Sequence, residues 1–514
     1  MLTKIYSAAI NGIDAFPVTI ETIVTQGIGF FIVGMADQAV RESYQRMAAA
    51  LIQTGLRFPH GRVTINLSPA DVRKEGASFD LPIAIGLLTA SETISCSNLD
   101  QYMMMGELSL DGSVLPVKGA LPMAIKAREM GFKRLIVPEA NVTEAAVVNK
   151  IEVVGVKTLG EVTRLLTGED PWEPVVINTR ELFAKEFEEF DFDFSEVKGQ
   201  ETVKRAFEVA CAGGHNILMV GPPGAGKSMM AKRLPSILPP LSMAEALETT
   251  KIHSVAGKLS RGSMLMTTRP FRTPHHTVSP VALVGGGANP MPGEISLAHN
   301  GVLFLDEFPE FPRQVLEVLR QPIEDRVITV ARAKYTVNYP ASFMLVASMN
   351  PCPCGYYGHP TKACSCTPGQ VTKYMNKISG PLLDRIDIQV EIEPVAFDDM
   401  ATTTPAESSA RIRERVINAR RIQGERYKSM TGIHCNAQMN SRMLHEYAWP
   451  DAEGLAKLKE RMTRLNMSAR AFDRILRVAR TIADLDASDR VETRHIAEAI
   501  SYRSLDRATY GHTF

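Results

Sequence analysis

Residues 221–228 read GPPGAGKS, which fits the pattern G-x-x-x-x-G-K-[ST] at every specified position. The apolar run at 216–220 is of strand type, and residues 229–234 favour a helix. Strand, glycine-rich loop and helix is the context that a phosphate-binding loop needs, because its backbone N–H groups must converge on phosphate oxygens. Lys227 would reach the β- and γ-phosphates, and Ser228 would offer its hydroxyl to Mg²⁺. The predicted nucleotide-binding residues of this loop are Gly221, Pro222, Pro223, Gly224, Ala225, Gly226, Lys227 and Ser228.

Composition places the chain among ordinary folded proteins. Its 514 residues allow roughly three domains, and 45% of the side chains are apolar and 22% charged. Lys and Arg together number 57, as do Asp and Glu, so any nucleic-acid contact must come from local basic patches. There is no apolar run of 18 residues and no signal-peptide pattern at the N-terminus. The seven cysteines do not form a secreted disulfide framework, so we expect a cytoplasmic protein without membrane contact.

Changes in local composition divide the chain into three parts and a linker. The first part alternates strands and helices, with a strand expected at 63–67 and a helix at 81–90. Pro171, Pro174 and an acidic, Phe-rich run mark the linker, and the last part contains a strong helix pattern at 469–485. We therefore predict an α/β fold class, with an N-terminal α+β domain, a central parallel sheet around the phosphate-binding loop, and a C-terminal α-helical domain. The predicted boundaries are 1–170, 171–193, 194–394 and 395–514.

Two further strands of the central part end in polar residues. The run VLFLDE at 302–307 would carry Asp306 and Glu307 out of the carboxyl end of a buried strand, beside the phosphate-binding loop. Asp306 could then hold Mg²⁺ through water, and Glu307 could polarise the attacking water. A second apolar strand at 342–349 ends at Asn350, whose amide could orient the same water. The alternatives are a helix cap for the acidic pair and a simple turn before proline for Asn350.

The order of these motifs is similar to that of AAA+ ATPases, in the magnesium-chelatase and MCM-helicase branch. The stretches RPFRTPHHT at 269–277, PGEISLAHNGVLFLDE at 292–307 and SGPLLDRID at 379–387 resemble the YifB/ComM family along essentially the whole chain. The resemblance implies a P-loop AAA+ core that binds ATP and Mg²⁺, followed by a helical lid.

The same resemblance gives roles to single residues. Arg385 matches the arginine finger, which acts on ATP bound to the neighbouring subunit and so implies a homo-oligomeric ring, usually a hexamer. Asn350 matches the first sensor, and Arg470 the second sensor, with Arg474 as the alternative. Ordinary surface arginines remain possible, because Arg470, Arg474 and Arg477 share one face of a helix. Residues 193–200 resemble the stretch near the adenine pocket.

Two insertions resemble those that separate this branch from plain AAA+ proteins. One lies within 252–293 and resembles the insertion into the second helix of the core. The other, RVITVARAKYTVNY at 326–339, reads as a hairpin with a basic tip. In related ring helicases this hairpin grips DNA in the central pore, which points to Arg332 and Lys334 as DNA-binding residues. A structural hairpin with solvated basic side chains is the alternative. His275 and His276 could serve the pore or a local turn.

The N-terminal part resembles the protease domain of Lon over 61–90 and 106–140. Ser78 falls at the position of the nucleophilic serine, but the partner lysine is replaced by Leu121. Lys118 and Lys126 are nearby but out of register. A serine without an oriented base is not an activated nucleophile, so we expect a non-proteolytic domain that binds DNA or helps to build the ring.

Four cysteines are packed into one short segment after Asn350. Two C-x-C pairs separated by nine residues could supply four thiolates to a structural zinc ion, although this spacing is tighter than the usual C-x₂₋₄-C. Four reduced thiols in a mobile loop are the alternative. The candidate zinc ligands are Cys352, Cys354, Cys364 and Cys366.

Three functions remain open from the sequence. The family resemblance implies an ATP-dependent, ring-forming DNA motor, a helicase or branch-migration enzyme acting on single-stranded or branched DNA in recombination or natural transformation. The core motifs alone fit equally well a magnesium-chelatase-type ATPase that remodels a partner protein. An ATP-dependent Lon-like protease is the third function, and the missing lysine argues against it.

Overall fold

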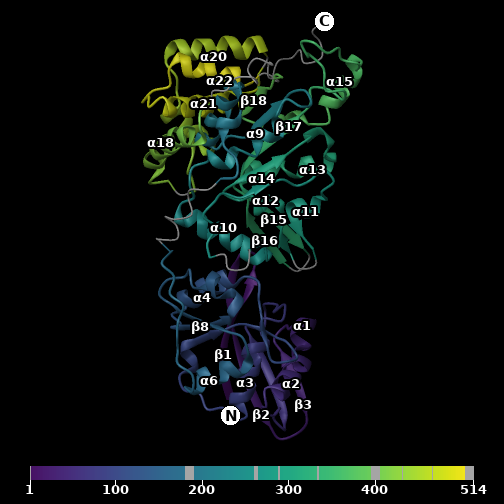
Figure 1. The fold of residues 1–514 in the computed structure, drawn as a ribbon, viewed down its shortest axis with the longest axis vertical. Helices are drawn as coiled ribbons and strands as arrows, with labels where there is room; N and C mark the ends of the chain where they lie inside the picture. The colour runs from purple at the N-terminus through teal and green to yellow at the C-terminus, as the bar shows by residue number, and fades with distance from the viewer. Residues whose placement is uncertain are drawn as a thin grey trace.

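The computed structural model describes residues 2–179, 190–259, 264–287, 290–332, 335–394, 406–430, 432–465 and 467–503, and for residues 332, 335 and 465 only the backbone. The N-terminal part (Figure 1) is built on a mixed sheet, whose seven strands follow the order β3-β4-β2-β1-β5-β8-β9. The β1–β2 and β2–β4 pairs are antiparallel, and the other pairs are parallel. The strands are β1 (Leu2–Asn11), β2 (Asp14–Thr25), β3 (Gly29–Val33), β4 (Arg62–Ser68), β5 (Tyr102–Met104), β8 (Arg134–Pro138) and β9 (Glu152–Val156).

Helices of this domain pack on the sheet according to their sequence. Helix α3 (Asp80–Ala90) is apolar on every side and is buried along its whole length. Helix α4 (Ala120–Glu129) covers another part of the sheet, with contacts to β1 and β2. The strand expected at 63–67 and the helix expected at 81–90 are confirmed by β4 and α3.

The central part contains a five-stranded sheet in the order β11-β14-β17-β10-β18, with every neighbouring pair parallel. Parallel strands bring their carboxyl ends to one edge, so loops that are distant in sequence meet there. Short apolar runs form these strands, which are buried on both faces in their inner members. The strands are β10 (Ile217–Val220), β11 (Phe271–Arg272), β14 (Val302–Leu305), β17 (Met344–Met349) and β18 (Ile388–Glu391).

Both predicted insertions carry hairpins. Between α11 (Pro280–Val284) and α12 (Glu294–Leu297), the strands β12 (Gly285–Gly286) and β13 (Met291–Pro292) pair within the predicted helix insertion. The second insertion is a hairpin of β15 (Val327–Arg332) and β16 (Tyr335–Pro340).

This second hairpin packs against the N-terminal domain. The β1–β2 turn lies so close to it that a Cβ on Gly12 would be 2.9 Å from Cγ1 of Val337. Ile13 belongs to the same buried apolar cluster as Val337. Helix α10 (Met243–Ala256) makes a second contact between the two parts, because it packs on α4.

The C-terminal part is helical (Figure 1), and it packs on the central sheet domain through α8 (Glu201–Gly213). The helix predicted at 469–485 is confirmed at both ends by α21, whose N-cap Ser468 accepts a hydrogen bond from the backbone N–H of Ala471 at 3.2 Å. Among the described residues, no helix has the length and apolar character needed to cross a bilayer. The helices are α18 (Ser409–Tyr427), α19 (Ser441–Tyr447), α20 (Ala452–Leu465), α21 (Ala469–Leu485) and α22 (Thr493–Ser501).

One buried ion pair joins this helical lid to the sheet domain. Asp387 is 1% exposed; its carboxylate accepts from Nη1 of Arg474 at 2.8 Å and from the backbone N–H of Asn216 at 3.0 Å. Although burial raises the pKa of Asp387, the charges of Arg474 and Arg477 and a hydrogen bond with His215 together outweigh burial, and the pKa lies well below its ordinary value. The ionised carboxylate is therefore part of the contact between lid and core.

Replacing this carboxylate should weaken the folded state. We expect Asp387→Asn to lower the free energy of unfolding by about 3 kcal/mol at pH 7, because Arg474 is left buried and unpaired. A carboxyl group whose pKa is lower in the folded state stabilises that state at every pH above its unfolded-state pKa of about 3.9. This contribution is lost as the pH falls from there towards the folded-state pKa. Denaturant unfolding of the wild type and of Asp387→Asn, at pH 7 and below pH 4, measures the loss of unfolding free energy. If this loss were as large in acid as at pH 7, the assignment of an ionised Asp387 carboxylate would be contradicted.

Candidate functional site

The phosphate-binding loop lies at the edge of the parallel sheet where the strands end. It joins β10 to α9 (Lys227–Ala231). Gly224 and Gly226 have φ angles of 83° and 88°, in the left-handed region that favours glycine. A Cβ on Gly221 would lie 2.4 Å from the carbonyl oxygen of Ile392, so this position also has no room for a side chain. These three glycines are required by the backbone path of the loop itself.

The ammonium of Lys227 points into this loop. It donates to two loop carbonyl oxygens, at 2.7 and 2.9 Å, and to Oδ1 of Asn350 at 3.1 Å. Burial lowers the pKa of Lys227, while the charges of Asp306 and Glu307 raise it. The structure thus brings together the lysine, the acidic pair and the asparagine that the sequence singled out from three separate strands.

Asp306 connects the loop to the next strand. Its Oδ2 accepts from the Ser228 hydroxyl at 2.5 Å, and its Oδ1 accepts from the backbone N–H of Glu307 at 3.0 Å and from the hydroxyl of Ser348. Carboxylate and hydroxyl oxygens side by side suit Mg²⁺, which prefers oxygen ligands and retains water. Ser348 was not predicted, although its place two residues before Asn350 on β17 puts it at the same edge.

The backbone of Glu307 is left-handed, with φ 53°. Its carboxylate is 58% exposed and lies 3.6 Å from Nδ1 of His276. His275 accepts from its neighbour Thr277 within a turn, and its ring lies 4.0 Å from that of His276. Both histidines thus make local contacts, and a role in the pore stays a prediction. Sequence reasoning missed the His276–Glu307 pair, because the two residues lie on different loops.

Arg385 lies at the opposite edge of the sheet from the phosphate-binding loop of its own chain. It lies three positions before the first residue of β18, which runs parallel to β10, whereas the loop follows β10. The four residues of such a strand separate the two edges by about 13 Å. The Arg385 side chain is 10% exposed, donates to Oε2 of Glu324 at 3.0 Å and to the carbonyl of Pro381 at 2.7 Å. Glu324, which holds the side chain, was not predicted.

Arg474 and Arg477 of α21 lie near this same opposite edge. Arg474 pairs with Asp387, two residues after Arg385, and Arg477 donates to the carbonyl of Met439 at 3.0 Å. Arg470, the predicted second sensor, is exposed near the start of the helix. Arg474 and Arg477 are therefore held by contacts inside the chain, and Arg470 is the member of the stripe that faces solvent.

The predicted DNA-binding tip falls mostly outside the described residues. Arg332 ends β15, and its side chain is not described; Lys334 lies between the described ranges. The two strands that carry the tip are in register from the pair Val327–Pro340 to the pair Arg332–Tyr335. The hairpin is confirmed, and its contact with DNA stays a prediction.

The site that corresponds to a Lon dyad contains no base next to Ser78. Within the described structure, the Ser78 hydroxyl makes no hydrogen bond, and Leu121 is buried in the apolar core. Lys126 pairs with Glu129 on its own helix at 2.7 Å. Lys118 lies instead against Gly257 of the central part. The arrangement is that expected for a domain without an activated serine.

The four cysteines converge on one point. Sγ of Cys352 lies 3.3 Å from that of Cys354 and 3.7 Å from that of Cys364, and Cys354 and Cys364 are 3.5 Å apart. All four sulfurs, including that of Cys366, lie within 4.8 Å of one another. A tetrahedral ion with Zn–S bonds of about 2.3 Å requires S···S separations of about 3.8 Å. The cluster fits a zinc ion, and these four side chains are the ones that would hold it.

The cysteine cluster also touches the phosphate-binding loop. Cys352 is buried two residues after Asn350. Gly355, with φ 85°, approaches Pro223 so closely that a Cβ would lie 2.5 Å from its Cδ. A hydrogen bond from the backbone of Tyr356 is the main cause that lowers the pKa of Cys354 to about 5. The metal-ligand loop is thus packed directly on the nucleotide-binding loop.

Family models cover most of the chain. Residues 193–400 match the model described as magnesium chelatase, subunit ChlI, and residues 406–503 match the C-terminal part of that subunit. Residues 20–141 match a model described as subunit ChlI of Mg-chelatase. The N-terminal domain therefore does not by itself separate this chain from proteins described as chelatase subunits.

Relatives that match the chain over nearly its whole length identify the family more closely than the family models do. The chain is 42% identical over 512 residues to the uncharacterized protein YifB of Escherichia coli, and 40% identical over 509 residues to the competence protein ComM of Haemophilus influenzae, with 98% of each chain covered in both. A shorter match, 38% over 102 residues, joins 19% of this chain to 15% of the archaeal Lon protease of Thermoplasma acidophilum. With its phosphate-binding loop, its acidic strand end and its parallel sheet, the chain belongs to the YifB/ComM family of magnesium-chelatase-like ATPases.

Proposed function

We propose that this ATPase is a ring-forming motor that moves DNA, by helicase or branch-migration activity, in recombination or natural transformation. The observation that carries the ring is the position of Arg385 at the edge of the sheet opposite its own phosphate-binding loop. This arginine can reach a nucleotide only on a neighbouring chain, and head-to-tail contacts that close produce a ring. Each nucleotide site would then be completed by the next subunit.

The chemistry of the proposed site follows from its own residues. Lys227 and the backbone of the loop would bind the triphosphate, while Ser228 and Asp306 would hold Mg²⁺. Glu307 would polarise the attacking water, and Asn350 would orient it. Arg385 of the next subunit would stabilise the charge that develops on the transferred phosphoryl group. The cysteine cluster would hold a structural zinc ion beside this site.

DNA as the partner rests on the hairpin and on a relative. Six copies of the basic hairpin tip, with Arg332 and Lys334, would concentrate positive charge in a pore although the net charge of the chain is zero. The relative named competence protein supports a role in natural transformation. The N-terminal domain would build the ring or bind DNA, because it has no activated serine.

A chelatase-type ATPase that remodels a partner protein is the second candidate, because the family models carry that description. The ATPase rate with single-stranded, duplex and forked DNA separates the two functions. For the motor we expect stimulation by at least one DNA form, with Glu307→Gln as the inactive control. DNA binding should fall about 10³-fold between 50 and 200 mM salt if six tips each neutralise one phosphate. No stimulation by any DNA form, with activity only beside a metal-inserting partner, would reject the motor.

A further inference from the structure

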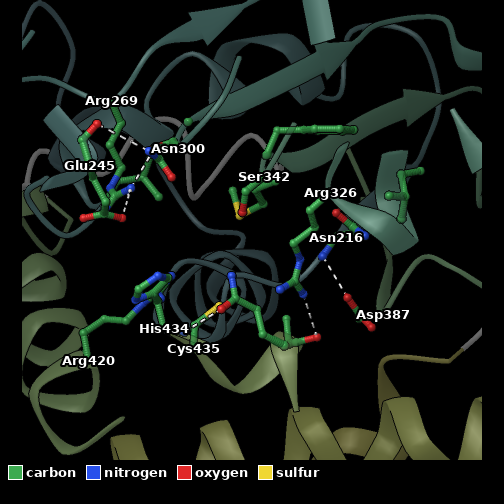
Figure 2. Close-up of a pocket in the computed structure, with 18 of the residues that line it drawn as sticks. Asn216, Glu245, Arg269, Asn300, Arg326, Ser342, Asp387, Arg420, His434 and Cys435 are labelled. Carbon is green, nitrogen blue, oxygen red and sulfur yellow. Dashed lines mark hydrogen bonds and ion pairs between the residues drawn. The ribbon is translucent and has the colours of Figure 1, made fainter. Parts of the chain in front are cut away.

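A cavity of about 90 Å³ lies between the sheet domain and the helical lid. It opens at the edge where β10, β14 and β17 begin, which is the edge opposite the phosphate-binding loop. Figure 2 shows Arg269, Glu245 and Asn300 at one end, and Arg326 and Asp387 at the other. Residues from core and lid line it together, so its contents would touch both parts.

The lining of this cavity is strongly basic. Four guanidinium groups stand against two carboxylates, which leaves an excess of two positive charges before His434 is considered. Both carboxylates are already used: Glu245 pairs with Arg269 at 3.1 Å, and Asp387 with Arg474 at 2.8 Å. The two remaining guanidiniums, of Arg326 and Arg420, have no carboxylate of a described residue within 4.0 Å.

These two arginines also keep most of their donors free. Arg326 donates one hydrogen bond, from Nη2 to the carbonyl of Ala437 at 3.4 Å, and Arg420 donates twice to the carbonyl of Cys211, at 3.3 and 3.1 Å. A guanidinium has five N–H donors. In the described structure, their other donors have no protein acceptor. Burial is the main cause that lowers the pKa of Arg326, and the nearby charge of Arg474 adds to the effect.

We propose that this cavity binds a small phosphate-bearing anion, which joins Arg326 of the core to Arg420 of the lid. Guanidinium groups pair with phosphate through two parallel hydrogen bonds, which is the geometry that the free donors allow. The anion would neutralise the charge excess, and this compensation is what partly buried like charges require.

This site is separate from the nucleotide site of the same chain, and it opens at the edge of the sheet that holds Arg385, where the ring contact is proposed. None of the phosphate-loop residues lines the cavity, and neither do Arg385 and Arg470. Arg326 directly precedes β15, so an anion bound there fixes the base of the hairpin against the lid. The inference stands whether or not the chain moves DNA.

Calorimetric titration of the full-length Lys227→Ala protein tests the proposal, because the loop variant silences phosphate binding at the nucleotide site. The probes are orthophosphate, pyrophosphate and adenosine monophosphate at constant ionic strength, and the tightest binder identifies the source of the anion. We expect one site per chain. Adding Arg326→Gln and Arg420→Gln should weaken binding about tenfold or more, since both charge-assisted pairs are lost.

Arg494→Gln, which changes an exposed arginine paired with Glu492, is the matched control and should bind as before. Melting temperatures measured with and without pyrophosphate test binding even where a variant is less stable. Pyrophosphate should raise the melting temperature of the Lys227→Ala protein. It should leave unchanged the melting temperature of the triple variant, which also carries Arg326→Gln and Arg420→Gln. Should the triple variant not fold, Arg326→Lys must weaken binding severalfold, because it keeps the charge but loses the planar pair of donors. No binding to the Lys227→Ala protein, or equal affinity after loss of the cavity arginines, overturns the proposal.

Discussion

A mixture of Arg385→Ala and Lys227→Ala subunits should hydrolyse ATP, although each variant alone should be inactive. Lys227→Ala removes the phosphate contact of a chain's own loop. Arg385→Ala leaves that loop intact and removes a group from the opposite edge of the sheet. Loss of an arginine finger costs about 10³-fold or more in turnover. In the mixed ring, an intact loop can meet an intact arginine where the two variants are neighbours in the right order.

The expected size of the recovered ATPase activity follows from how the two variants mix in the ring. If the variants assemble at random in equal amounts, about a quarter of the sites in a head-to-tail ring combine both intact groups. The ATPase rate of co-assembled protein, compared with each variant alone, measures this. Arg320→Ala is the matched control, because it removes a similar arginine paired with Glu317 at 2.8 Å. If the mixture stays inactive while nucleotide binding by Arg385→Ala is intact, Arg385 does not act between subunits.

The sequence predicts well the site residues that lie at the carboxyl ends of parallel strands. Lys227, Asp306 and Asn350 each follow or end a short apolar strand, and a parallel sheet must bring these strand ends to one edge. The helix at 469–485 was predicted at both ends, because its N-cap serine and its apolar periodicity are local signals.

Other features depend on contacts that no local pattern encodes. Glu324 holds Arg385 across 61 positions of sequence, and His276 meets Glu307 from another loop. The helix expected at 229–234 is instead Lys227–Ala231, which starts inside the glycine motif, and a separate 3₁₀ helix covers Leu234–Ser236. The basic cavity is likewise invisible in sequence, because core and lid supply its arginines separately.

Cys354→Ser should release the bound metal and weaken ATP binding in the same step. A structural zinc site contributes about 10 kcal/mol or more to the order of its loop, and three thiolates hold the ion less tightly than four. That loop begins next to Asn350, which accepts from Lys227, and its Gly355 is packed against Pro223. Disorder in the loop therefore removes two supports of the nucleotide site at once.

The measurements are zinc content per chain and the dissociation constant for ATP. Wild type should carry about one zinc ion, and the variant should bind ATP about tenfold more weakly, comparable to losses seen when the support of a metal ligand is removed. Cys96→Ser, in the N-terminal domain, is the matched control and should change neither quantity. Gly355→Ala separates the two effects: its Cβ would strike Pro223, so ATP binding should weaken while zinc is retained. Full ATP affinity in zinc-free protein would mean that the cysteine loop does not support the phosphate-binding loop.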